Sequence, residues 1–156
     1  MHHRIAAASL FLLALVLSAS CRSTQPAEAA GAGGAALRSL LRGYQSGIVA
    51  KGVRVARDAR EWEALWKEHT RNVLPRPDAP DVDFSREIVV GAFLGQRPSG
   101  GYAIAVTALR PDGGRLVVEA TETRPAPDRL VPQVLSSPYH FVTTAKTSAA
   151  PVLELE

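Results

Sequence analysis

Residues 88–94 read Ile-Val-Val-Gly-Ala-Phe-Leu, and this apolar run decides the fold. A run of this length, bounded by polar residues, is typical of a β-strand and shorter than an ordinary helix. No polar side chain interrupts it, so neither face of the strand is suited to contact with water. The run therefore predicts a strand that is covered on both faces.

Further strand patterns lie on either side of this run. Residues Tyr102–Leu109 alternate between apolar and other positions, and Leu116–Thr121 is a second strand pattern. The Pro-Asp-Gly-Gly sequence of residues 111–114 between them supplies a turn, so the two segments are predicted to form a hairpin. Additional strands are predicted over Gly47–Ala56, Tyr139–Ala145 and Val152–Leu155.

One segment has the pattern of a helix. Asp58 is followed three positions later by Glu61, which is a capping-box pattern. The residues on one stripe of the helix that follows are Ala59, Trp62, Leu65, Trp66 and His69. This spacing predicts one amphipathic helix at about residues 59–70, ended by a proline-rich loop. The expected fold class is α+β, a mostly antiparallel β-sheet packed with one amphipathic helix.

The first 20 residues have the pattern of a signal peptide. A basic start is followed by an apolar run at residues 5–17, which is too short to span a bilayer. Small residues then precede Cys21, the only cysteine, and together they resemble the lipobox of bacterial lipoproteins, with the leucine one place early. We expect export, cleavage before Cys21 and lipid attachment to its thiol. The alternative is an ordinary secretory signal cleaved near Ala29. Arg22 follows the cysteine, whereas an aspartate there would resemble the inner-membrane retention signal of enteric bacteria. The outer membrane is therefore favoured.

The remaining chain is predicted to contain a tether and one domain. Residues 21–43 are expected to form the lipidated cysteine and a flexible tether, because most of them are small or polar. Residues 44–156 suffice for one domain with one core. The net charge is +3, and the basic residues are scattered rather than clustered, which argues against nucleic-acid binding. The expected location is the cell envelope, facing the periplasm or the exterior.

Residues capable of catalysis or metal binding lack the patterns that those chemistries need. His69 closes the apolar stripe of the helix, and His140 has no carboxylate beside it in the sequence to orient its ring. No serine lies in a Gly-x-Ser-x-Gly motif. Three aspartates could offer oxygen ligands to calcium, but their segment lacks the glycine and the distal glutamate of a calcium loop: Asp78, Asp81 and Asp83. We therefore expect no enzymatic activity, no metal and no cofactor.

Several motifs occur in an order that resembles a known family. Trp62 and Trp66 precede Val82-Asp-Phe-Ser85, and the segments Gly95-Gln-Arg-Pro-Ser-Gly-Gly-Tyr102 and Ser137-Pro-Tyr-His140 follow. In this order the set resembles the C-terminal domain of the PrcB family, named for protease-complex subunits, over about residues 45–155. The resemblance implies a small secreted or lipid-anchored protein without catalytic activity. The implied partner is a protein, such as a secreted protease of the cell envelope.

The loop at residues 96–102 is the candidate contact surface. Glycines build it, and Arg97 and Tyr102 flank them, which are residue types enriched at interface hot spots. Pro98 fixes φ, and either Gly100 or Gly101 is expected to adopt positive φ. The partner-binding candidates are Phe84, Arg97, Gly100, Gly101, Tyr102 and Tyr139.

A second resemblance gives an alternative function. Residues 98–102 are similar to the Asn-Pro-Thr-Thr-Gly-Tyr loop of chagasin-like inhibitors of cysteine proteases. Gly113–Gly114 and Arg124–Pro125 would then correspond to their other two inhibitory loops, which enter the cleft of the enzyme. Arg97 stands in place of the asparagine, however, and a helix with two tryptophans is foreign to that all-β fold.

Overall fold

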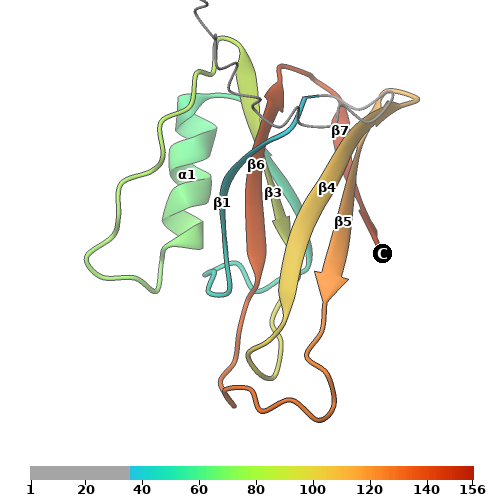
Figure 1. Ribbon diagram of the computed structural model, residues 1–156. Helices are drawn as coiled ribbons and strands as arrows, with labels where there is room; N and C mark the ends of the chain where they lie inside the picture. The colour runs from blue at the N-terminus through green and yellow to red at the C-terminus, as the bar shows by residue number, and fades with distance from the viewer. Residues whose placement is uncertain (1–35) are drawn as a thin grey trace, which may run out of the picture.

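The computed structural model describes residues 36–156, so the predicted signal peptide, Cys21 and the first part of the predicted tether lie outside the described residues. Residues 36–156 form seven strands and one short helix (Figure 1). The elements are β1 Arg38–Gly43, β2 Gly52–Ala56, α1 Ala59–His69, β3 Glu87–Phe93, β4 Ala103–Asp112, β5 Arg115–Thr123, β6 Tyr139–Ala145 and β7 Ala150–Leu155. The protein is mostly β with one short helix, as the sequence predicts.

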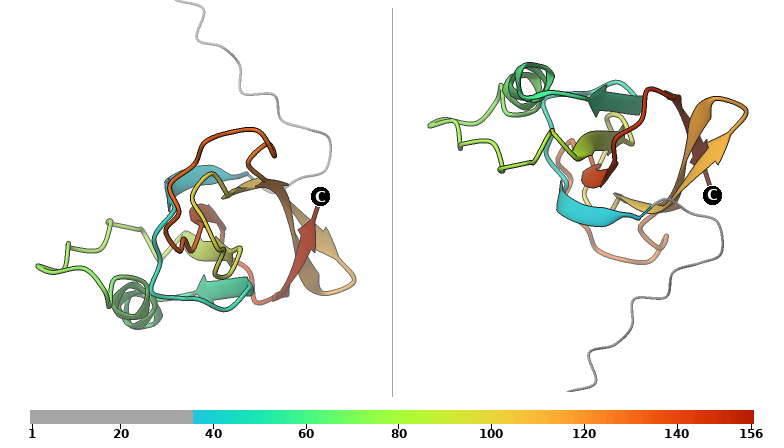
Figure 2. Two further views of the ribbon diagram at one scale, coloured as in Figure 1. Left: turned by 90° about the horizontal axis from the view of Figure 1, so that it is seen from below. Right: turned by 90° about the horizontal axis from the view of Figure 1, so that it is seen from above.

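The strands form two sheets. The first is antiparallel with the order β1-β6-β3-β2, and the second has the order β4-β5-β7. β4 and β5 form the predicted hairpin, and β7 pairs with β5 in the parallel direction. Figure 2 shows α1 against one side of the four-stranded sheet and the three-stranded sheet on its other side. The domain therefore has three layers.

β3 lies at the centre of these layers, and both of its faces are covered. Ile88, Val90 and Ala92 belong to the apolar core between the two sheets. Val89 and Phe93 belong to a second core that includes the helix tryptophans. All five side chains are buried. The prediction of a strand covered on both faces is therefore confirmed.

The helix is fixed at its start and along its buried side. The Asp58 carboxylate accepts a hydrogen bond from the Glu61 N–H at 2.8 Å, while the Glu61 carboxylate accepts one from the Arg57 N–H at 2.7 Å. The indole N–H of Trp62 donates to the Pro80 carbonyl, and that of Trp66 donates to the Pro77 carbonyl. The two tryptophans thus cover the sheet and also hold the proline-rich loop that follows the helix. Within residues 36–156 no helix has the length and apolar character needed to cross a membrane.

Two boundaries in the structure differ from those predicted from the sequence. The tether predicted for residues 21–43 ends earlier, because residues 38–43 form β1 and pair with β6. The strand predicted over Gly47–Ala56 is shorter at its start, and β2 begins at Gly52. The reason is that the Gly47 N–H donates to the His69 carbonyl at 2.7 Å, so this segment contacts the end of the helix instead of a strand.

Candidate functional site

Two loops gather at one end of the domain, opposite the end where the described chain begins. The glycine loop, residues 95–102, joins β3 to β4, and the proline loop, residues 124–138, joins β5 to β6. Both lie at the bottom of Figure 1, which we call the loop end. Arg38, at the start of β1, pairs with Thr143 near the far end of β6. The loop end is therefore separated by the length of a strand from the point where the preceding chain enters the domain.

The two loops are bonded to each other. The backbones of Arg97 and Ser136 exchange two hydrogen bonds, at 2.7 and 3.0 Å, and the Gly100 N–H donates to the Pro132 carbonyl at 2.8 Å. The buried Ser136 hydroxyl also donates to the Ser99 carbonyl at 2.7 Å. These bonds hold the loops in one arrangement, so little conformational entropy remains to be lost when a ligand binds.

Gly101 is the residue that shapes the contact between the loops. Its φ is +85°, which agrees with the prediction that one of the two central glycines has positive φ. A Cβ on Gly101 would lie 2.9 Å from Pro125 Cβ and 2.9 Å from Val131 Cγ1. The proline loop can therefore pack this closely only because residue 101 has no side chain.

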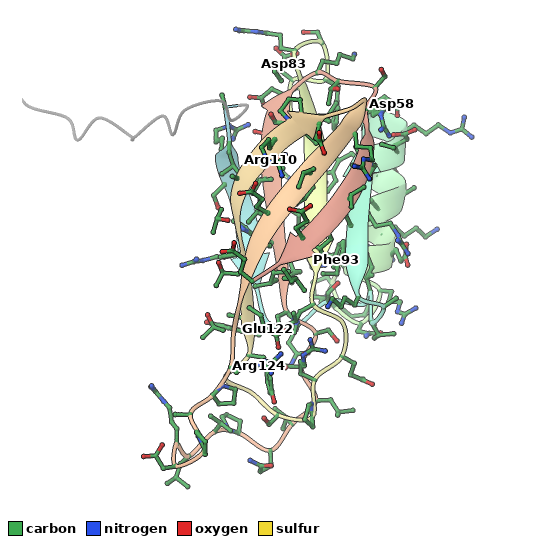
Figure 3. The ribbon with its side chains drawn as sticks, turned by 90° about the vertical axis from the view of Figure 1, so that its right-hand side faces the viewer. Asp58, Asp83, Phe93, Arg110, Glu122 and Arg124 are labelled. Atoms are coloured by element: carbon green, nitrogen blue, oxygen red, sulfur yellow. The ribbon has the colours of Figure 1, made fainter. Side chains whose placement is uncertain are left out.

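Arg97 and Tyr102 contact each other, and Arg97 also contacts a carboxylate of the domain. The Arg97 guanidinium lies 5.8 Å from the centroid of the Tyr102 ring and 3.5 Å from the Glu122 carboxylate. Arg124 contacts the same carboxylate at 3.1 Å (Figure 3 labels Glu122 and Arg124). Glu122 therefore balances only part of the positive charge at the loop end.

A groove of about 730 Å³ opens between the loops. The residues that line it are Tyr44, Gln45, Gly100, Gly101, Ala103, Thr123, Arg124, Pro125, Ala126, Arg129, Pro132, Val134 and Ser136. Its exposed apolar side chains include Tyr44 and Val134, and Leu130 and Leu135 are exposed on the same proline loop. Arginines are its only charged lining residues, so this loop-end groove combines apolar surface with positive charge.

The structure brings together four of the six predicted binding residues. Arg97, Gly100, Gly101 and Tyr102 share the glycine loop, and the two glycines line the groove.

The other two predicted residues do not line the groove, which corrects the expectation of one continuous surface. Phe84 precedes β3 at the opposite end of the domain, where its carbonyl accepts a hydrogen bond from Lys146 Nζ. Tyr139 is at the loop end but is buried against His69, with 4.2 Å between ring centroids. Phe84 was expected beside the glycine loop, but β3 lies between them and separates them by about 20 Å.

Sequence reasoning missed several residues of the groove. Tyr44 follows β1, and Arg129 and Val134 lie in the proline loop. A signal was present, because the proline loop carries large apolar side chains without the pattern of a strand or a helix. Such side chains in a long loop indicate a contact surface.

The two histidines of the domain are buried, and each joins neighbouring elements. His140 Nδ1 accepts the Val106 N–H at 2.8 Å, so Nε2 carries the proton toward Ser39 Oγ at 2.9 Å. His69 Nδ1 lies 3.0 Å from Ser46 Oγ. Burial lowers the pKa of His69 to about 4, and burial, with a smaller effect of Arg42, lowers the pKa of His140. Both rings are therefore neutral at pH 7.

Neither histidine has a carboxylate as a hydrogen-bond partner among the described residues. Within residues 36–156 there is also no group of three histidine, cysteine or acidic side chains placed to hold a metal ion.

The three segments that resemble the inhibitory loops of chagasin-like proteins do not lie at one end of the domain. The proline loop contacts the glycine loop at Gly101, next to Pro125. The Gly113–Gly114 turn joins β4 to β5 at the other end of the hairpin, at the top of Figure 1. Because β4 lies between the glycine loop and this turn, the three segments cannot enter one enzyme cleft together.

Comparison with known proteins identifies the segment that contains the loop end. No curated protein and no solved structure matches the chain. The family model described as PrcB C-terminal matches residues 88–145. The match runs from β3 to β6 and includes both loops, whereas β1, β2 and α1 lie before it. Over residues 88–145 the chain matches the PrcB C-terminal family, which confirms the resemblance seen in its sequence motifs.

Proposed function

We propose that this protein is a lipid-anchored binding domain of the cell envelope. In this role it is a non-catalytic accessory subunit that associates with an extracytoplasmic protease or another envelope protein. The observation that carries the proposal is the preformed loop-end groove, which lies between loops inside the segment that matches the PrcB C-terminal family. The PrcB family is named for protease-complex subunits, and this name suggests the class of partner.

The composition of the groove supports binding to a protein. Tyr44 and Val134 expose more than half of their surface, and Arg124 and Arg129 lie beside them. Aromatic residues and arginine are enriched among side chains that dominate binding energy at protein interfaces. The hydrogen bonds between the two loops limit the entropy that binding would cost.

The position of the groove supports a membrane-anchored role. β1 enters the domain at the end opposite the loop end. An anchor at Cys21 would therefore be connected to the far end, and the groove would remain accessible to a partner.

The absence of catalysis is also part of the proposal. His69 and His140 are buried and bonded to Ser46, Ser39 and the Val106 N–H, so a role in holding the fold accounts for both. We expect no turnover of ester, peptide or glycan substrates. Hydrolysis that is lost in a His69→Asn or His140→Asn variant that remains folded would contradict this part.

Capture of a partner tests the binding site. The wild-type chain and a Val134→Asp variant would be used to capture proteins from the envelope fraction, with Leu74→Asp as the matched control. Both side chains are exposed, but Leu74 lies in the loop after α1. We expect wild type and the control to retain an extracytoplasmic protease or another envelope protein, and Val134→Asp to lose it. Equal capture by both variants would exclude the loop end as the binding site.

The lipid anchor requires its own test. We expect Cys21→Ser to remove acylation and to release the protein from the membrane fraction. A Cys21→Ser protein that is still acylated and membrane-bound would show that the anchor lies elsewhere.

A further inference from the structure

A second, smaller cleft continues from the loop-end groove into the gap between the two sheets. It has a volume of about 290 Å³ and is lined by Arg42, Gly43, Tyr44, Ala103, Ile104, Ala105, Thr123 and Tyr139. We call it the seam cleft, because β1 and β4 border it and each is the outer strand of its sheet. Tyr44, Ala103 and Thr123 line both hollows, so the two form one continuous path.

The backbone of β4 presents a free edge to this path. On β5, the Glu122 N–H and the Ala120 carbonyl bond to Glu156, on the side of β7. Because backbone groups alternate along a strand, Thr121 and Thr123 face β4, opposite Ala105 and Ala103. The N–H and C=O of Ile104, which lies between those two residues, must therefore point away from β5, toward the seam cleft. An outer strand with such groups can accept another strand.

The free edge is short. Two residues beyond Ile104, the Val106 N–H donates to His140 Nδ1, and the β4–β5 register shifts between Val106 and Ala108. An added strand could therefore pair only with the first residues of β4. The rest of its binding energy would have to come from side chains in the loop-end groove.

The charge along the path is positive. Its charged lining residues are Arg42, Arg124 and Arg129, and none of the lining residues is a carboxylate. Arg124 shares Glu122 with Arg97, whereas Arg42 and Arg129 make no ion pair within residues 36–156. This charge is complementary to a segment that carries aspartate or glutamate.

We propose that the occupant of this path is an extended acidic segment of the partner protein, which pairs with β4 at Ile104 and places its carboxylates near the three arginines. This inference depends on the proposed function, that the loop end binds a protein. Successive side chains of an extended segment point to opposite sides. One side can therefore carry carboxylates while the other contacts apolar groups such as Tyr44 and Val134.

Peptide binding tests the inference. The full chain, purified in detergent, would be titrated with a labelled decapeptide in which glutamate alternates with valine, and binding would be followed by fluorescence anisotropy. The controls are the same peptide with lysine in place of glutamate, and two acidic peptides with N-methylated amides in one or the other alternating register. We expect the acidic peptide to bind, the lysine peptide not to bind, and at least one N-methylated peptide to bind at least about tenfold more weakly. Higher salt should weaken binding.

Charge reversal locates the binding site. We expect Arg129→Glu and Arg42→Glu each to weaken binding of the acidic peptide by about tenfold or more. Arg60→Glu, on the exposed side of α1, serves as the matched control and should leave binding unchanged. Equal binding of the acidic and lysine peptides, or no effect of either N-methylated register, would overturn the inference. If the chain self-associates and the peptide does not disrupt the association, the free edge of β4 would instead be assigned to a second copy of this chain.

The two proposals can fail separately. If Val134→Asp loses the native partner but the acidic peptide neither binds nor displaces that partner, the acidic-segment inference is wrong and the proposed function stands. If Val134→Asp and Leu74→Asp capture the partner equally, the loop end is not the binding site. If the wild-type chain captures no envelope protein, the proposed function itself is wrong.

Discussion

His69 connects the end of the helix to the sheet, and its environment makes stability depend on pH. Its ring packs edge-on against Tyr139 and Phe141, and burial lowers its pKa from 6.5 to about 4. Below pH 6.5 the unfolded chain binds a proton that the folded chain does not, so the free energy of unfolding falls as the pH falls toward 4. At about 1.4 kcal/mol per pKa unit, the loss from this residue amounts to roughly 3 kcal/mol at most.

Denaturant unfolding between pH 7 and pH 4 would measure this effect. In a His69→Asn variant the side-chain amide can still bond to Ser46, but residue 69 no longer titrates, so the pH dependence should be shallower. Part of the slope should remain, because the pKa of His140 is also lowered by burial. An NMR titration with a His69 pKa near 6.5 would contradict the prediction.

Gly101 provides a second prediction at the residue scale. In Gly101→Ala the new methyl would lie 2.9 Å from Pro125 Cβ, at a backbone φ of +85° that disfavours side chains. We expect a loss of about 1–3 kcal/mol in the free energy of unfolding, together with weaker binding at the groove. Gly100→Ala is the matched control, because its φ is ordinary and its nearest contact, Pro132 Cδ, lies at 3.2 Å. Equal stability of the two variants would show that the loops adjust.

At the scale of elements, the tryptophans of α1 determine how the following loop is held. Trp66→Phe keeps an aromatic ring next to Phe141 but removes the 2.7 Å hydrogen bond to the Pro77 carbonyl. We expect a loss of about 1 kcal/mol in stability and faster proteolysis between residues 71 and 80. Leu74→Ala, in the same loop but 90% exposed, should leave stability unchanged. Unaltered proteolysis of Trp66→Phe would show that the indole bond does not hold the loop.

The elements that could be predicted are those whose patterns are local. β3 and the β4–β5 hairpin have apolar periodicity and turn residues within the element itself, and the structure contains both. β1 was not predicted, because Arg38–Gly43 mixes polar and apolar residues and becomes a strand only by pairing with β6, about a hundred positions later. Its stability comes from that partner rather than from its own sequence pattern.

In the candidate site, too, only the features determined by local sequence could be predicted. The glycine loop could be found from its proline and glycines, whose backbone preferences are local. The placement of Tyr44 beside Val134 could not, because it depends on which strand ends meet at the loop end. For the same reason the sequence placed Phe84 wrongly at this surface.

At the scale of the whole molecule, β1 completes the fold as well as connecting the domain to the preceding chain. Leu37, Leu40 and Leu41 are partly buried against the two apolar cores. Removing them would expose apolar surface worth roughly 3–5 kcal/mol, which is comparable to the total stability of a small domain.

Truncation tests this role of β1. A chain that begins at residue 36 should fold and unfold cooperatively, whereas one that begins at Tyr44 should be largely unfolded or aggregate, as judged by circular dichroism and thermal melting. Equal melting temperatures of the two chains would show that β1 is dispensable.

The direction of β1 also determines how the domain would respond to mechanical force. The strand enters at the end opposite the loop end and runs antiparallel to β6, which begins directly after the proline loop. A pull between a membrane anchor and a partner held at the loop end would draw these two strands along their length in opposite directions. Their hydrogen bonds lie across the strands, so this force would load all of them in shear instead of opening them one after another. The attachment would therefore resist tension best along the line joining the anchor and the bound partner.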